Sequence, residues 1–244
     1  ASMGSDSFTA KSPRAGNQYL FAWKPAAREF FTLGLAAPRW TRAHYPNIPS
    51  VGRFEYQMFE PERWKPNYPT PAFDNRLPED NVWAAKQVMA FTDEQIRAIV
   101  KTGDYSDPKA EEWLSRCLIE RRNKIGRTYF AQLLPLDRFV VEDGRLQFVD
   151  LAVKHGFAPA ANYEVRWNRF DNETERNERL EGEKSLALPA AASRAAVGEY
   201  FAAEIWAGDP EKKVTVYLRR EASGFGVVGI EREARSRLRG GGKR

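Results

Sequence analysis

The stretches YFAAEIW at Tyr200–Trp206 and VTVYL at Val214–Leu218 decide the fold of the C-terminal half of this chain. In both, apolar side chains recur at every second position, which is the period of a strand that buries one face. Short strands at this spacing are typical of a small antiparallel sandwich. We therefore expect a β-sandwich domain over residues 162–232. Three further segments have strand-like composition: Tyr163–Trp167, Leu186–Leu188 and Phe225–Ile230.

Helical signals dominate the middle of the chain. Thr92 and Gln95 have the spacing of a capping box, in which each side chain binds the backbone N–H of the other residue. Asp107-Pro108 combines a capping side chain with proline in the first helical turn. These signals, with the apolar periodicity that follows them, predict helices over Pro78–Phe91, Thr92–Gly103 and Asp107–Phe130.

A hairpin and a change of periodicity follow the helices. Asp143-Gly144 lies between two apolar runs, and Asp-Gly is a strong signal for a two-residue hairpin turn. The regular strand alternation begins only after Gly156. We therefore predict an α+β protein with three parts. They are a mostly helical domain over 1–157, an antiparallel β-sandwich over 162–232, and a basic disordered tail over 233–244.

Residues 38–78 combine many prolines with many aromatic residues. Proline excludes a regular helix or a central strand, whereas disordered segments are poor in aromatic residues. We expect an ordered, extended segment that wraps over other structure. Its aromatic side chains are either pegs into a core or the lining of a ligand groove. We favour pegs, because buried area must hold such a segment down. The groove would be formed by Trp64, Tyr68 and Phe73.

The net charge of +5 does not indicate a nucleic-acid partner. Much of the excess lies in residues 231–244, where six Lys and Arg residues stand against two Glu residues. A dedicated nucleic-acid surface needs basic residues clustered on the folded body, so we expect no such partner. No segment reaches the roughly 18 apolar residues of a membrane helix, and we expect no membrane span.

Few residues in the chain suggest chemistry. The single cysteine, Cys117, lies among apolar residues of the third predicted helix, which favours a buried, inert thiol. His44 and His155 are far apart and have no acidic cluster beside them, so we expect no metal site. The basic residues of 121–124 are interpreted as a solvated face or as partners of carboxylates, rather than as a phosphate clamp.

The chain begins at Ala1-Ser2-Met3-Gly4-Ser5 rather than at an initiator methionine, although the sequence from Tyr19 onward is patterned like a folded protein. We expect it to be the C-terminal part of a longer protein. The apolar segment Tyr19–Leu35 has little of its own sequence to pack against. We therefore expect the missing N-terminal half of the same protein to be its partner.

Motifs along most of the chain resemble a family of uncharacterised secreted bacterial proteins. They lie at Ala1–Ser5, Glu55–Phe73, Trp83–Lys86, Phe91–Val100, Tyr105–Pro108, Leu118–Arg122 and Val227–Arg232. In that family the opening motif continues an Asp-Phe-Gly-like stretch, from which Met3 is a conservative departure. The family segment upstream of this stretch is similar to the catalytic loop of atypical kinases of the spore-coat and toxin-antitoxin kinds.

The resemblance implies an extracytoplasmic or secreted protein whose full-length form binds ATP and a divalent metal. It places the catalytic base and the metal-binding Asp before Ala1, so we expect this chain to be inert by itself and to hold no catalytic or metal-ligating residue. Gly4 and Ser5 are the cofactor-binding residues that the resemblance implies, as part of the turn after that Asp.

Two functions remain open. The first is the C-terminal part of a secreted atypical kinase-like protein. The second is a non-catalytic cell-envelope protein that uses the β-sandwich and the aromatic segment to bind a polymer or a protein partner. The residues of this chain do not decide whether the full-length protein is an enzyme. The upstream sequence distinguishes the two, since a kinase needs a Lys/Glu pair, a catalytic-loop Asp/Asn and an Asp before the Gly.

Overall fold

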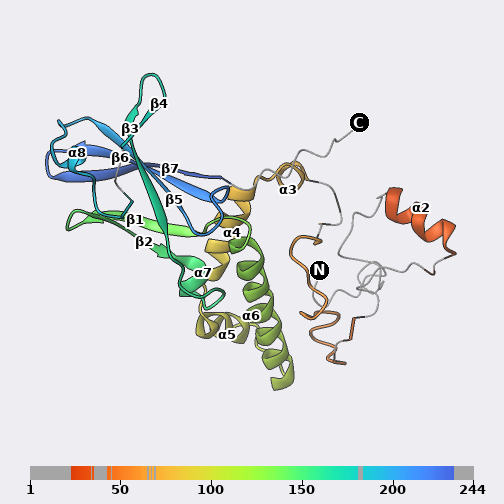
Figure 1. Cartoon of the computed structure of the whole chain (residues 1–244). Helices are drawn as coiled ribbons and strands as arrows, with labels where there is room; N and C mark the ends of the chain where they lie inside the picture. Colours follow the sequence, from red (N-terminus) through yellow and green to blue (C-terminus); the bar gives the residue numbers. More distant parts are fainter. Residues whose placement is uncertain are drawn as a thin grey trace. The chain divides into compact units, whose positions relative to one another are not determined.

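The computed structural model describes residues 23–33, 35, 43–44, 46–64, 66, 68, 70–180 and 184–233. The chain forms two compact units, Ala1–Thr128 and Tyr129–Arg244. Helices and antiparallel sheets are both present, which confirms the α+β class (Figure 1). Within the described residues, no helix is both long enough and apolar enough to cross a membrane. Apart from Glu233, the predicted tail at 233–244 lies outside the described residues.

Helices account for the regular structure of the first unit within its described residues. The long helix α6 has its last two residues in the second unit. Pro25 lies in the first turn of the N-terminal helix, which begins at Trp23 and where no intrahelical N–H is needed. The helices are α2 (Trp23–Phe31), α3 (Pro71–Asp74), α4 (Pro78–Met89), α5 (Asp93–Lys101) and α6 (Pro108–Phe130).

The predicted helix starts are confirmed in atomic detail. The backbone N–H of Gln95 donates to Thr92 Oγ1 at 3.2 Å, and the N–H of Thr92 donates to Gln95 Oε1 at 2.9 Å. At the start of α6, the N–H of Lys109 donates to Asp107 Oδ1 at 2.9 Å. Each bond satisfies a backbone donor that has no partner inside its helix, which fixes where the helix begins.

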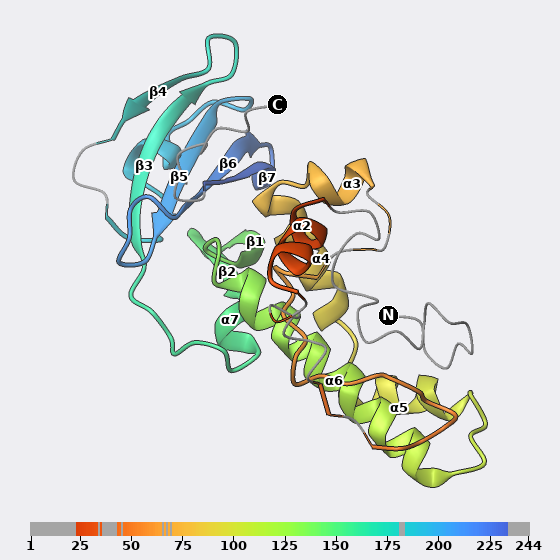
Figure 2. The same ribbon diagram turned by 90° about the vertical axis from the view of Figure 1, so that its right-hand side faces the viewer.

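The aromatic segment does lie against a core, as one of its two interpretations predicts. Val51 and Phe54 are buried with Ile96 of α5 and Leu114 of α6 in one cluster. Figure 2 shows the orange trace of this segment running along α6. The exclusion of helix between 38 and 78 was wrong at one place, α3, which begins at a proline. Proline suits the first turn because its missing N–H would have no partner there.

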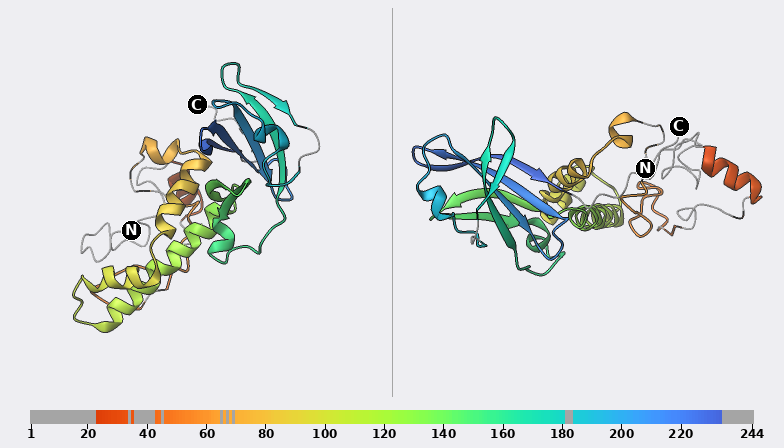
Figure 3. Two further views of the ribbon diagram at one scale, coloured as in Figure 1. Left: turned by 90° about the vertical axis from the view of Figure 1, so that its left-hand side faces the viewer. Right: turned by 45° about the horizontal axis from the view of Figure 1, so that its top comes forward.

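A five-stranded antiparallel sheet forms the body of the second unit. Its strand order is β4-β3-β5-β6-β7, with β4 and β7 at the two edges (Figure 3). A separate hairpin, β1–β2, turns at Asp143-Gly144, where both residues have positive φ angles of 49° and 69°. The strands are β1 (Leu136–Glu142), β2 (Arg145–Asp150), β3 (Glu164–Asp171), β4 (Arg176–Arg179), β5 (Tyr200–Trp206), β6 (Lys213–Glu221) and β7 (Gly224–Arg232).

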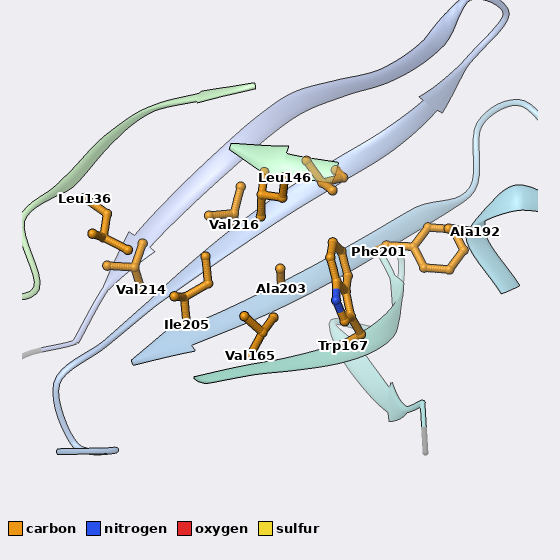
Figure 4. Packing of buried hydrophobic residues seen from close by; sticks show 11 residues of the cluster. Leu136, Leu146, Val165, Trp167, Ala192, Phe201, Ala203, Ile205, Val214 and Val216 are labelled. Carbon is orange, nitrogen blue, oxygen red and sulfur yellow. The ribbon is translucent and has the colours of Figure 1, made fainter. Parts of the chain in front are cut away.

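One face of this sheet carries the core of the second unit. The alternate residues predicted from the sequence, such as Phe201, Ile205 and Val216, are fully buried there. Figure 4 shows them meeting Leu136 and Leu146 of the hairpin. The hairpin therefore belongs by packing to the same unit as the sheet, although the sequence pattern grouped it with the helices. Whether 1–157 and 162–232 behave as separate domains stays a prediction.

Two strand assignments differ from the sequence-based ones. Leu186–Leu188 is not a strand of the large sheet; it extends the hairpin, where the N–H of Leu146 donates to the Leu186 carbonyl at 2.8 Å. The polar residues after β3 contain β4, a strand without apolar alternation, since all four of its residues are polar and exposed. The turn before β4 is held by Asp171, whose Oδ1 accepts from the N–H groups of Glu173 and Thr174. A helical turn, α8 (Ala190–Ser193), and another, α7 (Leu151–Lys154), complete the unit.

Candidate functional site

The predicted groove residues are only partly brought together. The rings of Trp64 and Phe73 lie 5.4 Å apart between centroids at an angle of 54°. Tyr68 is 61% exposed and Phe73 is 41% exposed. The aromatic side chains by which the segment packs into a core are Phe54 and, in part, Tyr56, not the three residues of the predicted groove. Gly4 and Ser5 lie outside the described residues.

The basic residues of α6 hold the aromatic segment in place. Arg121 Nε donates to the Glu55 carbonyl at 2.6 Å, and its guanidinium lies 4.0 Å from the centre of the Phe54 ring. Burial lowers the pKa of Arg121 from its ordinary value. Lys124 Nζ donates to three carbonyls, those of Tyr56, Gln57 and Phe59, at 2.7, 2.9 and 3.2 Å. Arg121 and Lys124 thus bind backbone carbonyl groups, whereas the sequence analysis expected a solvated face or carboxylate partners.

Arg122 has the carboxylate partner that the sequence suggested. Its Nη2 lies 2.6 Å from Asp93 Oδ1, at the start of α5, and its Nη1 donates to the Phe91 carbonyl at 2.7 Å. The guanidinium thereby ties α6 to the loop before α5. Arg121, Arg122 and Lys124 all bind other parts of the protein, so we call these three residues of α6 a structural clamp.

The second face of the five-stranded sheet is the strongest candidate for a binding surface. We call it the polar face and define it by the even-numbered residues of β3 and β5, the odd-numbered residues of β6 from 213 to 219, and Gly229 and Glu231 of β7. Successive side chains of a strand point to opposite sides of the sheet. Since the core occupies one side, these residues lie on the other.

Glu204 organises the charges at the centre of the polar face. Its carboxylate accepts from Asn168 Nδ2 at 2.9 Å and lies 3.2 Å from Lys213 Nζ and 3.6 Å from an Arg166 nitrogen. Lys213 also lies 3.2 Å from Glu233. Burial lowers the pKa of Lys213, but the hydrogen bonds and charges of Glu204 and Glu233 outweigh it and raise that pKa above its ordinary value. The network fixes side chains from three adjacent strands.

An aromatic pair lies beside this network. The rings of Phe170 on β3 and Tyr217 on β6 approach to 4.8 Å between centroids, across the intervening strand β5. The strand between them carries Ala202, which is fully buried beneath side chains of its neighbours. On the other side of Tyr217, a Cβ added to Gly229 would lie 3.2 Å from the tyrosine ring. Two small residues thus make room for the Tyr217 ring on the sheet.

Hydrogen bonding fixes the outer end of the same tyrosine. Tyr217 Oη donates to Glu231 Oε2 at 3.0 Å. Burial, together with the hydrogen bond and charge of Glu231, raises the pKa of Tyr217 to about 12. The phenol is therefore protonated at neutral pH and acts as a donor. Its ring remains half-buried, so part of its surface is available to a ligand.

Two further rings of the polar face are paired with guanidinium groups. Arg166 lies 5.4 Å from the ring centre of Trp206, and Arg219 lies 5.8 Å from that of Tyr200. Both aromatic side chains are half-buried and both arginines are exposed. Such pairs orient the cation over the ring. The polar face consequently presents several rings in fixed positions rather than a mobile polar surface.

The remaining titratable groups of interest have structural roles. Cys117 is fully buried, and burial raises the pKa of its thiol to about 11. Tyr163 Oη donates to Asp150 Oδ2 at 2.8 Å, while Asp150 Oδ1 accepts from the first N–H groups of α7. Among the residues that the structure describes, no group of three His, Cys, Asp or Glu side chains could hold a metal ion.

No protein-family model, curated protein or solved structure matches this chain. The suggested kinship with secreted bacterial proteins and atypical kinases thus stays a proposal.

The sequence contained a signal for the polar face that its interpretation did not use. The apolar alternation of β5 and β6 places Tyr200, Trp206 and Tyr217 on the side opposite the core. An aromatic residue on the solvent side of an alternating strand is an exception to the simple pattern of apolar in and polar out. That exception marks two neighbouring strands of the same face, whereas the proline and aromatic content of the chain pointed to 64–73.

Proposed function

We propose that this chain is a non-catalytic binding protein of the cell envelope, which holds an extended polymer on the polar face of its five-stranded sheet. One observation carries the proposal: one side of the sheet carries the apolar core of the unit, while its other side holds half-buried aromatic rings between paired charges. Aromatic side chains offer large contact areas with little loss of conformational freedom. Paired charges keep the surrounding donors and acceptors in place before a ligand arrives.

The proposal includes a β-sandwich in the second unit. In it, the β1–β2 hairpin is a second layer that covers the apolar side of the large sheet. The shared burial of Leu136, Leu146 and Val216 supports this arrangement. With the apolar side covered in this way, the polar face is the side of the sheet that a long polymer could reach.

Cosedimentation of the full chain with isolated bacterial cell walls tests the proposal. Trp206→Ala and Tyr217→Ala are expected to reduce the bound fraction strongly, since each removes a ring of the polar face. Tyr68→Ala is the matched control, because it removes an exposed ring of the predicted groove in the first unit. Loss of binding in the control, with binding unchanged in the other two variants, would move the site to Trp64, Tyr68 and Phe73.

A second candidate function keeps the kinase-like resemblance. In it, the chain is the C-terminal part of a secreted atypical kinase-like protein, and an N-terminal half of that protein covers α2. The large exposed fractions of Trp23 and Phe31 on this helix, 79% and 81%, support such a cover. The test is metal-dependent ATP binding by the full-length protein, compared with a Gly4→Val variant. Equal binding by both would remove Gly4 from the nucleotide site.

A further inference from the structure

The charges of the polar face bear on the chemistry of its ligand. The residues that define the face include three cations, Arg166, Lys213 and Arg219, and three carboxylates, Glu164, Glu204 and Glu231. At its margins Arg179 of β4 and Glu221 of β6 add one charge of each sign. Glu204 lies against both Arg166 and Lys213, and Glu233 adds a further carboxylate to Lys213. A polyanion needs an excess of positive charge along its path, and a polycation needs the reverse. This face provides neither.

The hydrogen-bonding groups of the face suit hydroxyls. A hydroxyl donates one hydrogen bond and accepts two, so it can bind a carboxylate and a guanidinium at the same time. Arg166 is 43% exposed, and its partner Glu204 is 13% exposed at the side chain, which leaves the arginine accessible beside a fixed acceptor. Glu231, whose Oε2 accepts from Tyr217, is exposed as well. Donors and acceptors therefore alternate along the surface.

The aromatic rings are spaced along the strands. Tyr217 pairs with Ala202 in the sheet, and Lys213 pairs with Trp206. The two rows are four residue steps apart along β5, from Ala202 to Trp206, which corresponds to about 13 Å at about 3.3 Å per residue. The electron-rich face of an aromatic ring attracts weakly positive C–H groups, and the apolar face of a sugar ring is made of such groups. Two rings at this separation fit sugar units of one oligosaccharide.

We infer that the polymer held by the polar face is a neutral polysaccharide, with sugar rings stacked on Tyr217 and Trp206 and hydroxyls bound by Arg166 and the carboxylates between them. This inference rests on the proposed function, because it names the ligand class of the same site. Anionic polymers and proline-rich peptides, which also bind aromatic surfaces, are the alternatives that the experiment separates.

Isothermal titration calorimetry of the full chain provides the test. The ligands are neutral hexasaccharides that differ in linkage (cellohexaose, laminarihexaose and maltohexaose), an alginate oligosaccharide and a proline-rich peptide. At least one neutral hexasaccharide is expected to bind, with an affinity that changes by less than about twofold between low and high salt, since no phosphate-like charge is neutralised. Trp206→Ala and Tyr217→Ala are expected to weaken it by about tenfold or more, equal to about 1.4 kcal/mol.

Two variants and one further measurement serve as controls. Tyr217→Phe keeps the ring and is expected to retain most of the binding, while Tyr68→Ala is expected to leave it unchanged. The further measurement is hydrogen exchange of the wild-type protein, whose result does not depend on whether a variant folds. The neutral ligand is expected to slow exchange in segments 200–206 and 213–221, and protection confined to other segments would overturn the inference.

The other outcomes are also distinguishable. Binding of alginate or the peptide, but of no neutral hexasaccharide, would overturn the neutral-sugar inference; if that binding were lost in Trp206→Ala, the proposed function would stand. Neutral-sugar binding that survives in both ring-deleted variants would overturn the site and with it the proposed function. Failure of the wild-type chain to bind any of these ligands would overturn the inference, and failure to bind cell walls as well would overturn the proposed function.

Discussion

The ring of Tyr217 meets the ring of Phe170 at 4.8 Å across β5, on which Ala202 is the register partner of Tyr217. The two aromatic residues lie on strands that are not neighbours in the sheet. They meet because Ala202 is small enough to lie beneath them, and because Gly229 leaves the other side of Tyr217 free. The candidate surface thus depends on small residues as much as on aromatic ones.

Replacing Ala202 with Leu should destabilise the protein and separate the two rings. The side chain at this position is fully buried, so added methyl groups force shifts that typically cost about 1–3 kcal/mol. Chemical denaturation measures the loss, and calorimetry measures the accompanying loss of ligand affinity. Ala196→Leu at an exposed position is the control. Equal stability of the two variants would show that the space above β5 is not filled.

Replacing Lys124 with Met should loosen the aromatic segment from α6. The change removes a donor shared by the carbonyls of Tyr56, Gln57 and Phe59. We expect a loss of about 1–2 kcal/mol in the free energy of unfolding, because these groups are partly accessible to water. Lys109→Met, at an exposed position in the first turn of the same helix, should change stability by less than about 0.5 kcal/mol. A comparable loss in both variants would argue against the clamp.

Tyr217 should make stability fall at alkaline pH. Its pKa is raised from 10.0 to about 12 in the folded protein, so folding favours the protonated phenol. The contribution is fully present below pH 10 and is lost as the pH rises from 10 toward 12. Tyr217→Phe removes this titration, so the stability difference between wild type and variant should shrink over that window. A difference that stays constant from pH 9 to 12 would contradict the raised pKa.

Cys117 should be chemically silent in the native protein. The residue is fully buried, and its pKa of about 11 leaves little thiolate at neutral pH. A disulfide reagent that reports free thiols is expected to react slowly under native conditions and completely in denaturant. Rapid native labelling would mean that the core between the aromatic segment and α6 opens readily.

Limited proteolysis should cut the exposed link at 158–161 without releasing a domain. The hairpin residues Leu136 and Leu146, which precede the link, share a core with the strands that follow it. The nicked protein is therefore expected to elute as a single species in size-exclusion chromatography and to separate only in denaturant. Release of separate 1–157 and 162–232 products under native conditions would instead support two independent domains.

The sequence by itself determined the local structure. The reciprocal hydrogen bonds of Thr92 and Gln95 and the Asp143-Gly144 turn depend on neighbouring residues, so their patterns sufficed to predict them. Alternation in β5 and β6 likewise identified which side chains would be buried, because the period of a strand is a property of its backbone. The α+β class followed from these local signals.

Tertiary structure alone decided which distant residues meet. Strand order brings Phe170 near Tyr217, and the packing of residues 46–64 on α6 gives Lys124 three carbonyl partners. β4 has no apolar alternation of its own and exists because β3 offers it a backbone edge. Such contacts depend on how elements pair and pack, which no local pattern encodes. The sequence marked aromatic residues on the outer side of β5 and β6, but only the folded protein joins them with the charged network into one polar face.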